Sequence, residues 1–453
     1  MSNDTKPADI ESFSLEKVSA ASDVSSWWDK APENPLNWQP GAKWAVIGAC
    51  RYKPSYRRPI ASSIMGPALP DIGQHYGIES ETVTALTLSI FLLAWVVGPL
   101  FFGPLSEVYG RRWIFIAANV FFLAFNIACI FAPSTGTLIA FRFLAGLGAS
   151  VPYIYRKLSR QPDIRVFPRR VLLGPPLGPV MGGYLTQTVG FKYCFVVSSA
   201  LCGAALVVAL LFLKETYGPV IRERLSAANS GSSATIDALA TNDEAQKHPS
   251  NLYAAIIFGI LNAFFTTFPI LFEDEYGFSP GSTGLTYLGG GLGELLSAII
   301  MGGIGASIYA KLSAGNGGVG KPEYRVPAMY PAAILAPGGL FWYGWSAQNH
   351  LHWIMPVLGS AIFCFGMIAS LLPIQLYFLD SFTYAASALA ATSALRFAFG
   401  FAFPLFVPHM ISAMGYGGTY SFFGGILLLI GVPFPLWIFY KGEEIRKKSS
   451  LTH

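Results

Sequence analysis

Three charged residues, Arg142, Glu294 and Arg396, lie well inside long apolar stretches of this chain. Ionisable side chains in such surroundings are costly, and they usually serve proton transfer, ion pairing or ligand binding. Glu294 lies near the middle of the apolar stretch 283–306, where loss of water would favour its protonated form. We expect it to carry a proton; the alternatives are a fixed ion pair or a helix bend among Gly289–Gly293.

The two arginines each admit more than one interpretation. Arg142 lies about five residues into the apolar stretch 136–155, so its long side chain would either reach the polar boundary or face a cavity or partner. Arg396 is central in the stretch 384–408. There it would hold an anionic substrate group, balance Glu294, or form a structural pair.

Uncharged polar and aromatic residues supply candidate ligand contacts. A broad apolar pocket with a few polar anchors suits flat hydrophobic or amphiphilic compounds. Most aromatic residues in such a chain serve packing or the membrane interface instead. The candidate substrate-binding residues are Asn262, Phe264, Phe265, Gln375 and Tyr377.

The composition places these residues in a membrane protein. A soluble domain carries roughly 25% charged residues, whereas this chain of 453 residues has 12% charged and 53% hydrophobic residues and a mean hydropathy of +0.48. The net charge of +5 is not gathered in a basic soluble domain, so nucleic-acid binding is not expected. The five cysteines form no C-x-x-C pair, which leaves no sequence signal for a metal site or a disulfide framework.

No nucleotide-binding motif or other cofactor signature is present, so we expect neither an enzyme nor an ATP-driven pump. The first 26 residues are polar and lack an apolar core, which predicts a cytosolic N-terminus without a cleaved signal peptide.

A membrane-spanning helix needs about 20 mostly apolar residues. Eleven stretches meet this requirement: 82–103, 113–133, 136–155, 171–189, 191–213, 251–272, 283–306, 327–346, 353–378, 384–408 and 419–440. A defective twelfth, 44–69, precedes them and contains the segment GACRYKPSYRRPIASS. Its four Arg and Lys residues would cost on the order of 10 kcal/mol to insert.

The spans predict an all-α polytopic membrane protein with two six-helix bundles and an atypical first span. Residues 44–213 and 251–441 would form the bundles, 214–250 a cytosolic linker, and 1–43 and 442–453 cytosolic tails. Arg and Lys gather in one alternating set of loops, and the acidic residues gather in the other. The basic loops are therefore cytoplasmic.

The segment GPLSEVYGRR, residues 103–112, resembles the loop signature of the major facilitator superfamily. In that family the loop stabilises one conformation of the transporter. The corresponding residues of this chain are Gly103, Glu107, Gly110, Arg111 and Arg112. Its glycines allow tight turns, and Glu107 is placed to pair with an arginine or cap the next helix.

LIAFRFLAGLGAS, residues 138–150, resembles the fourth-span signature of the family, in which the arginine at Arg142 is associated with proton coupling. GPPLGPVMGG is similar to the fifth-span antiporter signature. Its glycines allow close helix contact, and its proline loosens the helix. The signature residues are Gly174, Gly178, Pro179, Gly182 and Gly183.

The lead-in WWDKAPENPLNW and several later segments, including PEYRVP and SALRFAFGFAFPLF, resemble the fungal twelve-span drug:proton antiporter branch. This resemblance implies a major facilitator fold and proton-coupled export of small organic compounds by a multi-pass protein, most often monomeric and in the plasma membrane. Its partners would be the substrate, protons and the lipid bilayer.

Two segments depart from the family pattern: the basic residues at 50–59, and 151–170, where the loop is short and almost wholly basic. These departures keep open a degenerate non-transporting paralogue or a faulty gene model. A proton-coupled nutrient symporter and a polyamine transporter are further alternatives.

Overall fold

The computed structural model describes residues 63–108, 111–150, 174–212, 249–381 and 385–447, and these parts are almost entirely helical. Seven helices in them are long and apolar enough to cross a membrane. Almost all of the basic first span lies outside the described residues, as do the basic loop 151–170 and most of the 214–250 linker.

The N-terminal half is a bundle of five described helices in which α7 packs against both α5 and α6. A short 3-10 turn, η1, and the helix α4 precede them. The bounds are Gly66–Ala68 (η1), Leu69–Tyr76 (α4), Glu81–Val108 (α5), Arg111–Ile130 (α6), Thr135–Ser150 (α7), Gly174–Val189 (α9) and Lys192–Phe212 (α10).

The C-terminal half packs α13 against α17 and α16 against α14 and α15. Its elements are Pro249–Ile270 (α13), the π-helical turn Leu271–Glu275 (η3), Pro280–Gly315 (α14), the 3-10 segment Pro322–Met329 (η4), Tyr330–Gln348 (α15), Ile354–Ser381 (α16), Ala385–Gly431 (α17) and Pro433–Lys447 (α18). Gly415 interrupts α17 with φ 71° and ψ 177°, a conformation that glycine adopts without a Cβ clash, so α17 is two helices in succession.

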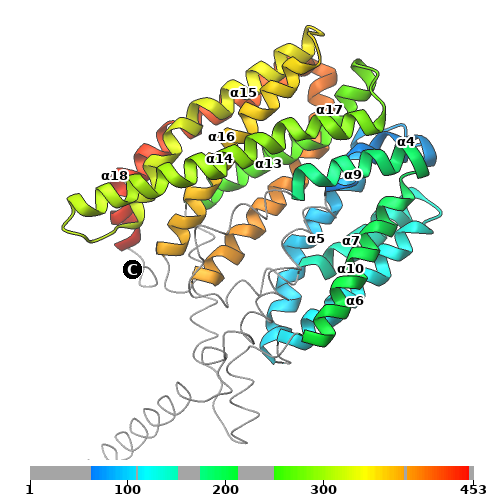
Figure 1. Cartoon of the computed structure of the whole chain (residues 1–453), viewed down its shortest axis with the longest axis horizontal. Coiled ribbons are helices and arrows are strands. Elements are labelled where there is room, and N and C mark those ends of the chain that lie inside the picture. The colour runs from blue at the N-terminus through cyan, green and yellow to red at the C-terminus, as the bar shows by residue number, and fades with distance from the viewer. Residues whose placement is uncertain (1–62, 109–110, 151–173, 213–248, 382–384, 448–453) are drawn as a thin grey trace, which may run out of the picture.

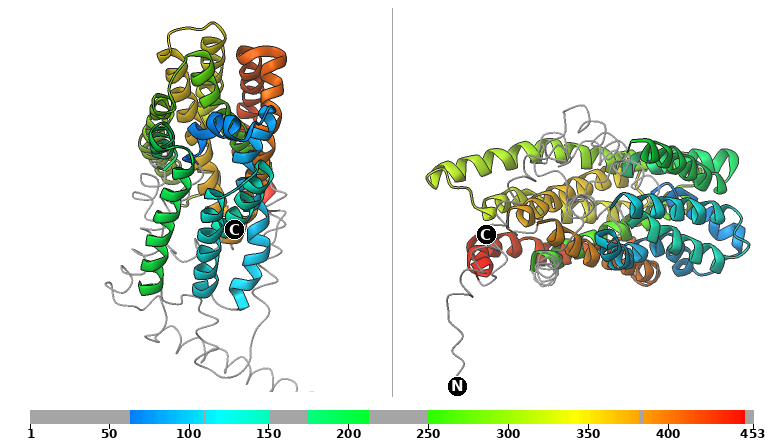
Figure 2. Two further views of the ribbon diagram at one scale, coloured as in Figure 1. Left: turned by 90° about the vertical axis from the view of Figure 1, so that its right-hand side faces the viewer. Right: turned by 90° about the horizontal axis from the view of Figure 1, so that it is seen from below.

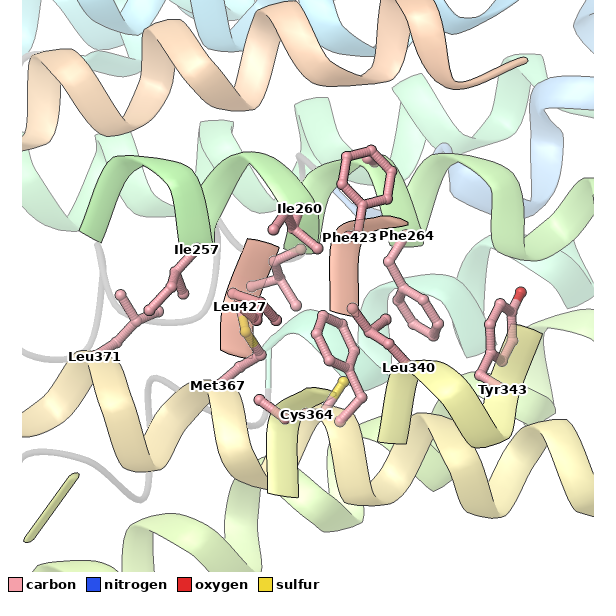
Figure 3. Close-up of a cluster of buried hydrophobic side chains, with 14 of the residues drawn as sticks. Ile257, Ile260, Phe264, Leu340, Tyr343, Cys364, Met367, Leu371, Phe423 and Leu427 are labelled. Atoms are coloured by element: carbon pink, nitrogen blue, oxygen red, sulfur yellow. The ribbon is translucent and has the colours of Figure 1, made fainter. Parts of the chain in front are cut away.

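An aromatic core holds the C-terminal half together. Phe264 of α13 lies against Tyr343 of α15 and Phe363 of α16, with ring centroids 4.8 and 5.0 Å apart. Figure 3 shows Phe264 directed toward Leu340 and Tyr343 inside this cluster. Each large ring buried here removes apolar area from solvent or lipid and adds oriented ring contacts.

Two helix pairs make the largest contacts between the halves: α5 with α17, and α9 with α14. The N-terminal bundle and the C-terminal bundle meet along these pairs at a slant (Figure 1). Two perpendicular views keep α9 beside α14 and the start of α5 beside α17 (Figure 2).

The helices follow the predicted spans, with two differences. α14 extends to Gly315, beyond the predicted end at 306, because a helix can continue into the polar region where hydropathy falls. The predicted last span, 419–440, is not one helix: it is divided at Val432 between α17 and α18. Pro433 starts α18, and a proline cannot donate the backbone hydrogen bond that would continue α17.

Candidate transport site

Glu294 lies on the inner side of α14 with 3% of its surface exposed. Among the residues that the structure describes, one carboxylate oxygen, Oε2, has no hydrogen-bond partner, and neither does the nearby Ser297 hydroxyl. The Cys364 thiol of α16 is close enough to interact electrostatically with the carboxylate. A buried carboxyl group with an open acceptor position is suited to bind a proton or a polar ligand group.

The residues on the different sides of α14 show why Glu294 faces inward. Gly284 and Gly291 face α9, because a Cβ on either would meet Pro179 or Pro176. Leu285 and Leu292 are exposed on the outer side, by 41% and 59%.

Tyr287, which precedes Glu294 by seven residues, lies on the same side of the helix, since about two turns separate them. Its ring stacks on Phe265 of α13 at 5.9 Å, and its hydroxyl donates to the Phe265 carbonyl at 3.0 Å. The glycine run Gly289–Gly293 produces no break in α14, and no ion pair involves Glu294 within the described parts of the chain.

Arg142 is buried near the middle of the 16-residue α7, with 4% of its surface exposed. Its guanidinium lies over the rings of Phe91 and Phe195, at 5.6 and 5.9 Å. Within the described parts of the chain, Nε and Nη2 have no hydrogen-bond partner and no carboxylate pairs with the guanidinium. The side chain therefore stays in the bundle rather than reaching the polar boundary, and ring faces lie over its charged group.

Arg396 lies where α17 meets the N-terminal half. Its Nη2 donates to Ser393 Oγ at 2.8 Å. The next residue, Phe397, contacts Trp95 of α5 at 4.9 Å and Phe258 of α13 at 5.6 Å. No ion pair joins Arg396 to Glu294 among the residues described, so the three charged residues do not form one cluster.

The candidate substrate residues separate into two groups. Asn262 and Phe265 lie on α13 near elements that meet the other half: the Asn262 amide faces Gly400 of α17, and Phe265 stacks on Tyr287. Phe264 is 1% exposed inside the aromatic core of the C-terminal half.

The two α16 candidates lie toward the end of that helix. Tyr377 is buried one turn before Asp380, which forms an ion pair with Arg325 at the end of α16. Gln375 is half-buried two residues earlier. The structure thus brings Asn262 and Phe265 toward the contact between the halves, and it places Phe264 and Tyr377 elsewhere.

Tyr287, whose ring connects Glu294's side of α14 to α13, was not among the residues predicted from the sequence. The seven-residue spacing to Glu294 was the one available signal, since residues at i and i+7 share a helix side. Gln187, which contacts the start of α14, carried no local signal at all.

The chain is similar to a known protein family over most of its length. The family model described as Major Facilitator Superfamily matches residues 59–155 and 171–404. The chain belongs to the major facilitator superfamily.

Curated relatives of this major facilitator protein are fungal transporters. The MFS transporter cpaT of Aspergillus oryzae is 36% identical over 96% of this chain and 94% of its own length. The efflux pump vrtL of Penicillium aethiopicum is 37% identical over 93% of this chain and 90% of its own length. The protein is therefore a membrane transporter of the major facilitator type.

Solved structures share the fold. A partially occluded, inward-open form of the E. coli xylose transporter XylE aligns with a TM-score of 0.65 at 13% identity, covering 88% of this chain and 97% of that one. The human organic anion transporter MFSD10 aligns with a TM-score of 0.57 at 17% identity, covering 88% of this chain and all of that one. The expected all-α major facilitator fold is confirmed.

The antiporter-type signature lies at the contact between the halves. Gly174, Gly178, Pro179, Gly182 and Gly183 are buried on α9. A Cβ on Gly183 would overlap the Pro280 carbonyl of α14, and one on Gly182 would overlap the Ile64 carbonyl. These glycines thus allow backbone contact between α9 and its neighbours.

The loop signature between α5 and α6 is described only in part. α5 ends at Val108 and α6 begins at Arg111, and the side chains of Gly103, Glu107, Gly110 and Arg111 lie outside what the structure describes. The Arg112 guanidinium lies over the ring of Trp113 at 5.5 Å.

Proposed function

We propose that this transporter exports small hydrophobic or amphiphilic organic compounds in exchange for protons. The observation that carries the proposal is Glu294: a carboxyl group buried on the inner side of α14, with an open acceptor position and no ion pair within the described residues. Such a group can be neutral or charged according to what occupies the site.

In this scheme the halves rock around a site near the middle of the membrane, as in other major facilitator transporters. Glu294 takes up a proton when the site faces outward and releases it when the site faces the cytoplasm. The substrate moves in the opposite direction. Arg142 and Arg396 would respond to this change of charge through the packing of α7 and α17.

We infer the substrate class from the rings near the meeting of the halves and from the relatives. Trp95, Phe258, Phe265, Tyr287 and Phe397 offer flat apolar surfaces there. Asn262 adds a polar anchor. Two relatives carry the name efflux pump, which supports export. The plasma membrane and a monomeric state remain part of the proposal.

Export can be tested in cells that lack their own drug pumps. Cells producing the protein and control cells would be loaded with fluorescent amphiphiles: rhodamine 6G, ethidium and Nile red. We expect at least one probe to leave faster from cells with the transporter, and a protonophore to remove the difference. Equal efflux of every probe would refute the substrate class, and faster uptake at acidic external pH would favour a symporter.

A further inference from the structure

Gln187 connects the two halves at the outer end of α9. Its Oε1 accepts hydrogen bonds from the backbone N–H of Gly281 at 3.2 Å and from the Ser279 hydroxyl at 3.3 Å. Ser279 is the N-cap residue of α14, and Gly281 belongs to its first turn. A side chain from the N-terminal half therefore caps a helix of the C-terminal half.

The backbone groups at the start of α14 show what this cap supplies. The first N–H groups of a helix have no partner within the helix. Pro280 has no N–H, the Ser282 N–H donates to Ser279 Oγ, and the Thr283 N–H donates to the Ser279 carbonyl. Only the Gly281 N–H takes its partner from the other half. Without Gln187 this group would need water or another acceptor.

The surrounding packing leaves little room for such a replacement. A Cβ on Gly281 would overlap Gln187 Oε1, and one on Gly183, a turn earlier on α9, would overlap the Pro280 carbonyl. Further along, Gly284 and Gly291 of α14 meet Pro179 and Pro176. The two helices thus touch along most of α9, and this end of the contact must separate whenever the site opens to the outside.

We propose that Gln187 is a positioning residue for transport that holds the outer side of the molecule closed. Its two hydrogen bonds exist only while α9 and α14 touch at their outer ends, so they stabilise the cytoplasm-facing state relative to the outward-facing state. The inference does not depend on the proton or on the substrate, and it holds for either direction of transport.

The chain offers a matched control. Gln348 of α15 accepts a hydrogen bond from the Gly417 N–H at 3.2 Å, at the start of the second part of α17. This is the same kind of bond, but both partners belong to the C-terminal half. Loss of the Gln348 bond should therefore leave the balance between the two states unchanged.

The test measures the distance between the outer ends of the halves by double electron–electron resonance. Spin labels would be attached through Val189→Cys on α9 and Leu351→Cys in the α15–α16 connection, both exposed positions. Cys50 would be replaced by Ser; Cys129, Cys194, Cys202 and Cys364 are buried. The readout is the ratio of long to short distances in purified full-length protein.

We expect Gln187→Leu to raise this ratio about two- to tenfold, the range that corresponds to loss of a typical hydrogen bond. Gln187→Glu, which keeps an acceptor at the same place, should restore the wild-type ratio. Gln348→Leu should match the wild type. An unchanged ratio in Gln187→Leu, or an equal rise in Gln348→Leu, would overturn the proposal.

A second variant keeps the test decisive if Gln187→Leu does not fold. Gly281→Ala places a methyl group against Gln187 Oε1 and should also raise the long-distance fraction. Its control is Gly302→Ala on the same helix, where no atom lies within 4 Å of the added Cβ. If Gly281→Ala and Gly302→Ala give the same distances as wild type, the outer contact does not govern the closed state.

Discussion

The buried and half-buried arginines of this transporter differ in the groups that surround their charge. Arg325 pairs with Asp380 at 2.9 Å and lies over the ring of Tyr309 at 4.0 Å. Arg142 has ring faces around it but no ion pair among the described residues. An ion pair can offset part of the desolvation free energy of a buried charge, and ring faces offset less of it. A function in transport would explain why a charge is retained at the Arg142 position.

Arg142 should therefore lower the free energy of unfolding of the protein. We predict that Arg142→Met raises the free energy of unfolding by about 1–3 kcal/mol, because a poorly compensated buried polar group is removed, while transport falls. The measurement is thermal unfolding in detergent together with probe efflux from cells.

Arg325→Met is the matched comparison. It leaves Asp380 without its cation, so it should lower the unfolding free energy, by about 1–3 kcal/mol for a charge-assisted hydrogen bond. Equal destabilisation by both substitutions would show that Arg142 is a structural residue.

At this scale the sequence predicts where charges lie but not what they touch. Arg142 and Glu294 stand out because their flanking residues are apolar. Phe195, whose ring lies under the Arg142 guanidinium, and Cys364, close enough to Glu294 for an electrostatic interaction, belong to helices distant in the sequence. No local sequence pattern records these neighbours. Phe264 and Phe265 show the same limit, since these adjacent residues of α13 take different partners: Phe264 lies inside the core of the C-terminal half, and Phe265 stacks on Tyr287 of α14.

At the level of secondary structure, ion pairs join α18 to the 3-10 segment η4 and to the residue before it, and these pairs differ in burial. Arg446 forms two hydrogen bonds of 3.2 Å with the Glu323 carboxylate, whose side chain is 4% exposed. Lys321 pairs with Glu443 at 2.7 Å on the surface. The Glu443 carboxylate, bonded to the lysine, raises the pKa of Lys321.

These pairs should differ in their contribution to stability. Arg446→Met leaves the Glu323 carboxylate buried with its bidentate partner removed, so we predict a loss of about 3–5 kcal/mol in unfolding free energy. Lys321→Met breaks an exposed pair and should change little, because solvent already screens it. Thermal unfolding of both variants is the measurement, and a larger loss in Lys321→Met would contradict this account of α18.

Hydropathy predicts that a helix crosses the membrane but not where the helix ends. α14 continues to Gly315 because residues 307–315 keep helical geometry after the apolar stretch has ended. The break at Gly415 depends on a positive φ, which a glycine permits but does not require. The pairing of α9 with α14 depends on glycines in both helices. Neither set of glycines predicts from its own sequence which helix it will contact.

For the whole molecule, the hydrogen bonds and close contacts that join the halves favour closure on the outer side. Thr82 at the start of α5 lies 3.2 Å from the His409 ring of α17. Gln187 reaches Gly281, and the Tyr287 hydroxyl lies next to Gly66.

The orientation of the molecule gives a direct prediction. Val319, in the α14–η4 connection, is 63% exposed, and Leu351, in the α15–α16 connection, is 44% exposed. The distribution of basic loops predicts that the first connection is cytoplasmic and that the second lies outside. A membrane-impermeant thiol reagent should label Leu351→Cys in intact cells and Val319→Cys only after permeabilisation. The reverse pattern would invert the assigned orientation.

Reconstituted flux under a pH gradient tests the central claim most directly. Liposomes containing wild-type protein or Glu294→Gln would be given a probe that the cells export, with equal pH on both sides or with a gradient. We predict that the gradient drives the wild-type protein to accumulate the probe, and that Glu294→Gln equilibrates the probe without responding to the gradient. Wild-type flux that ignores the gradient, or a Glu294→Gln protein that responds as the wild type does, would contradict proton exchange through Glu294.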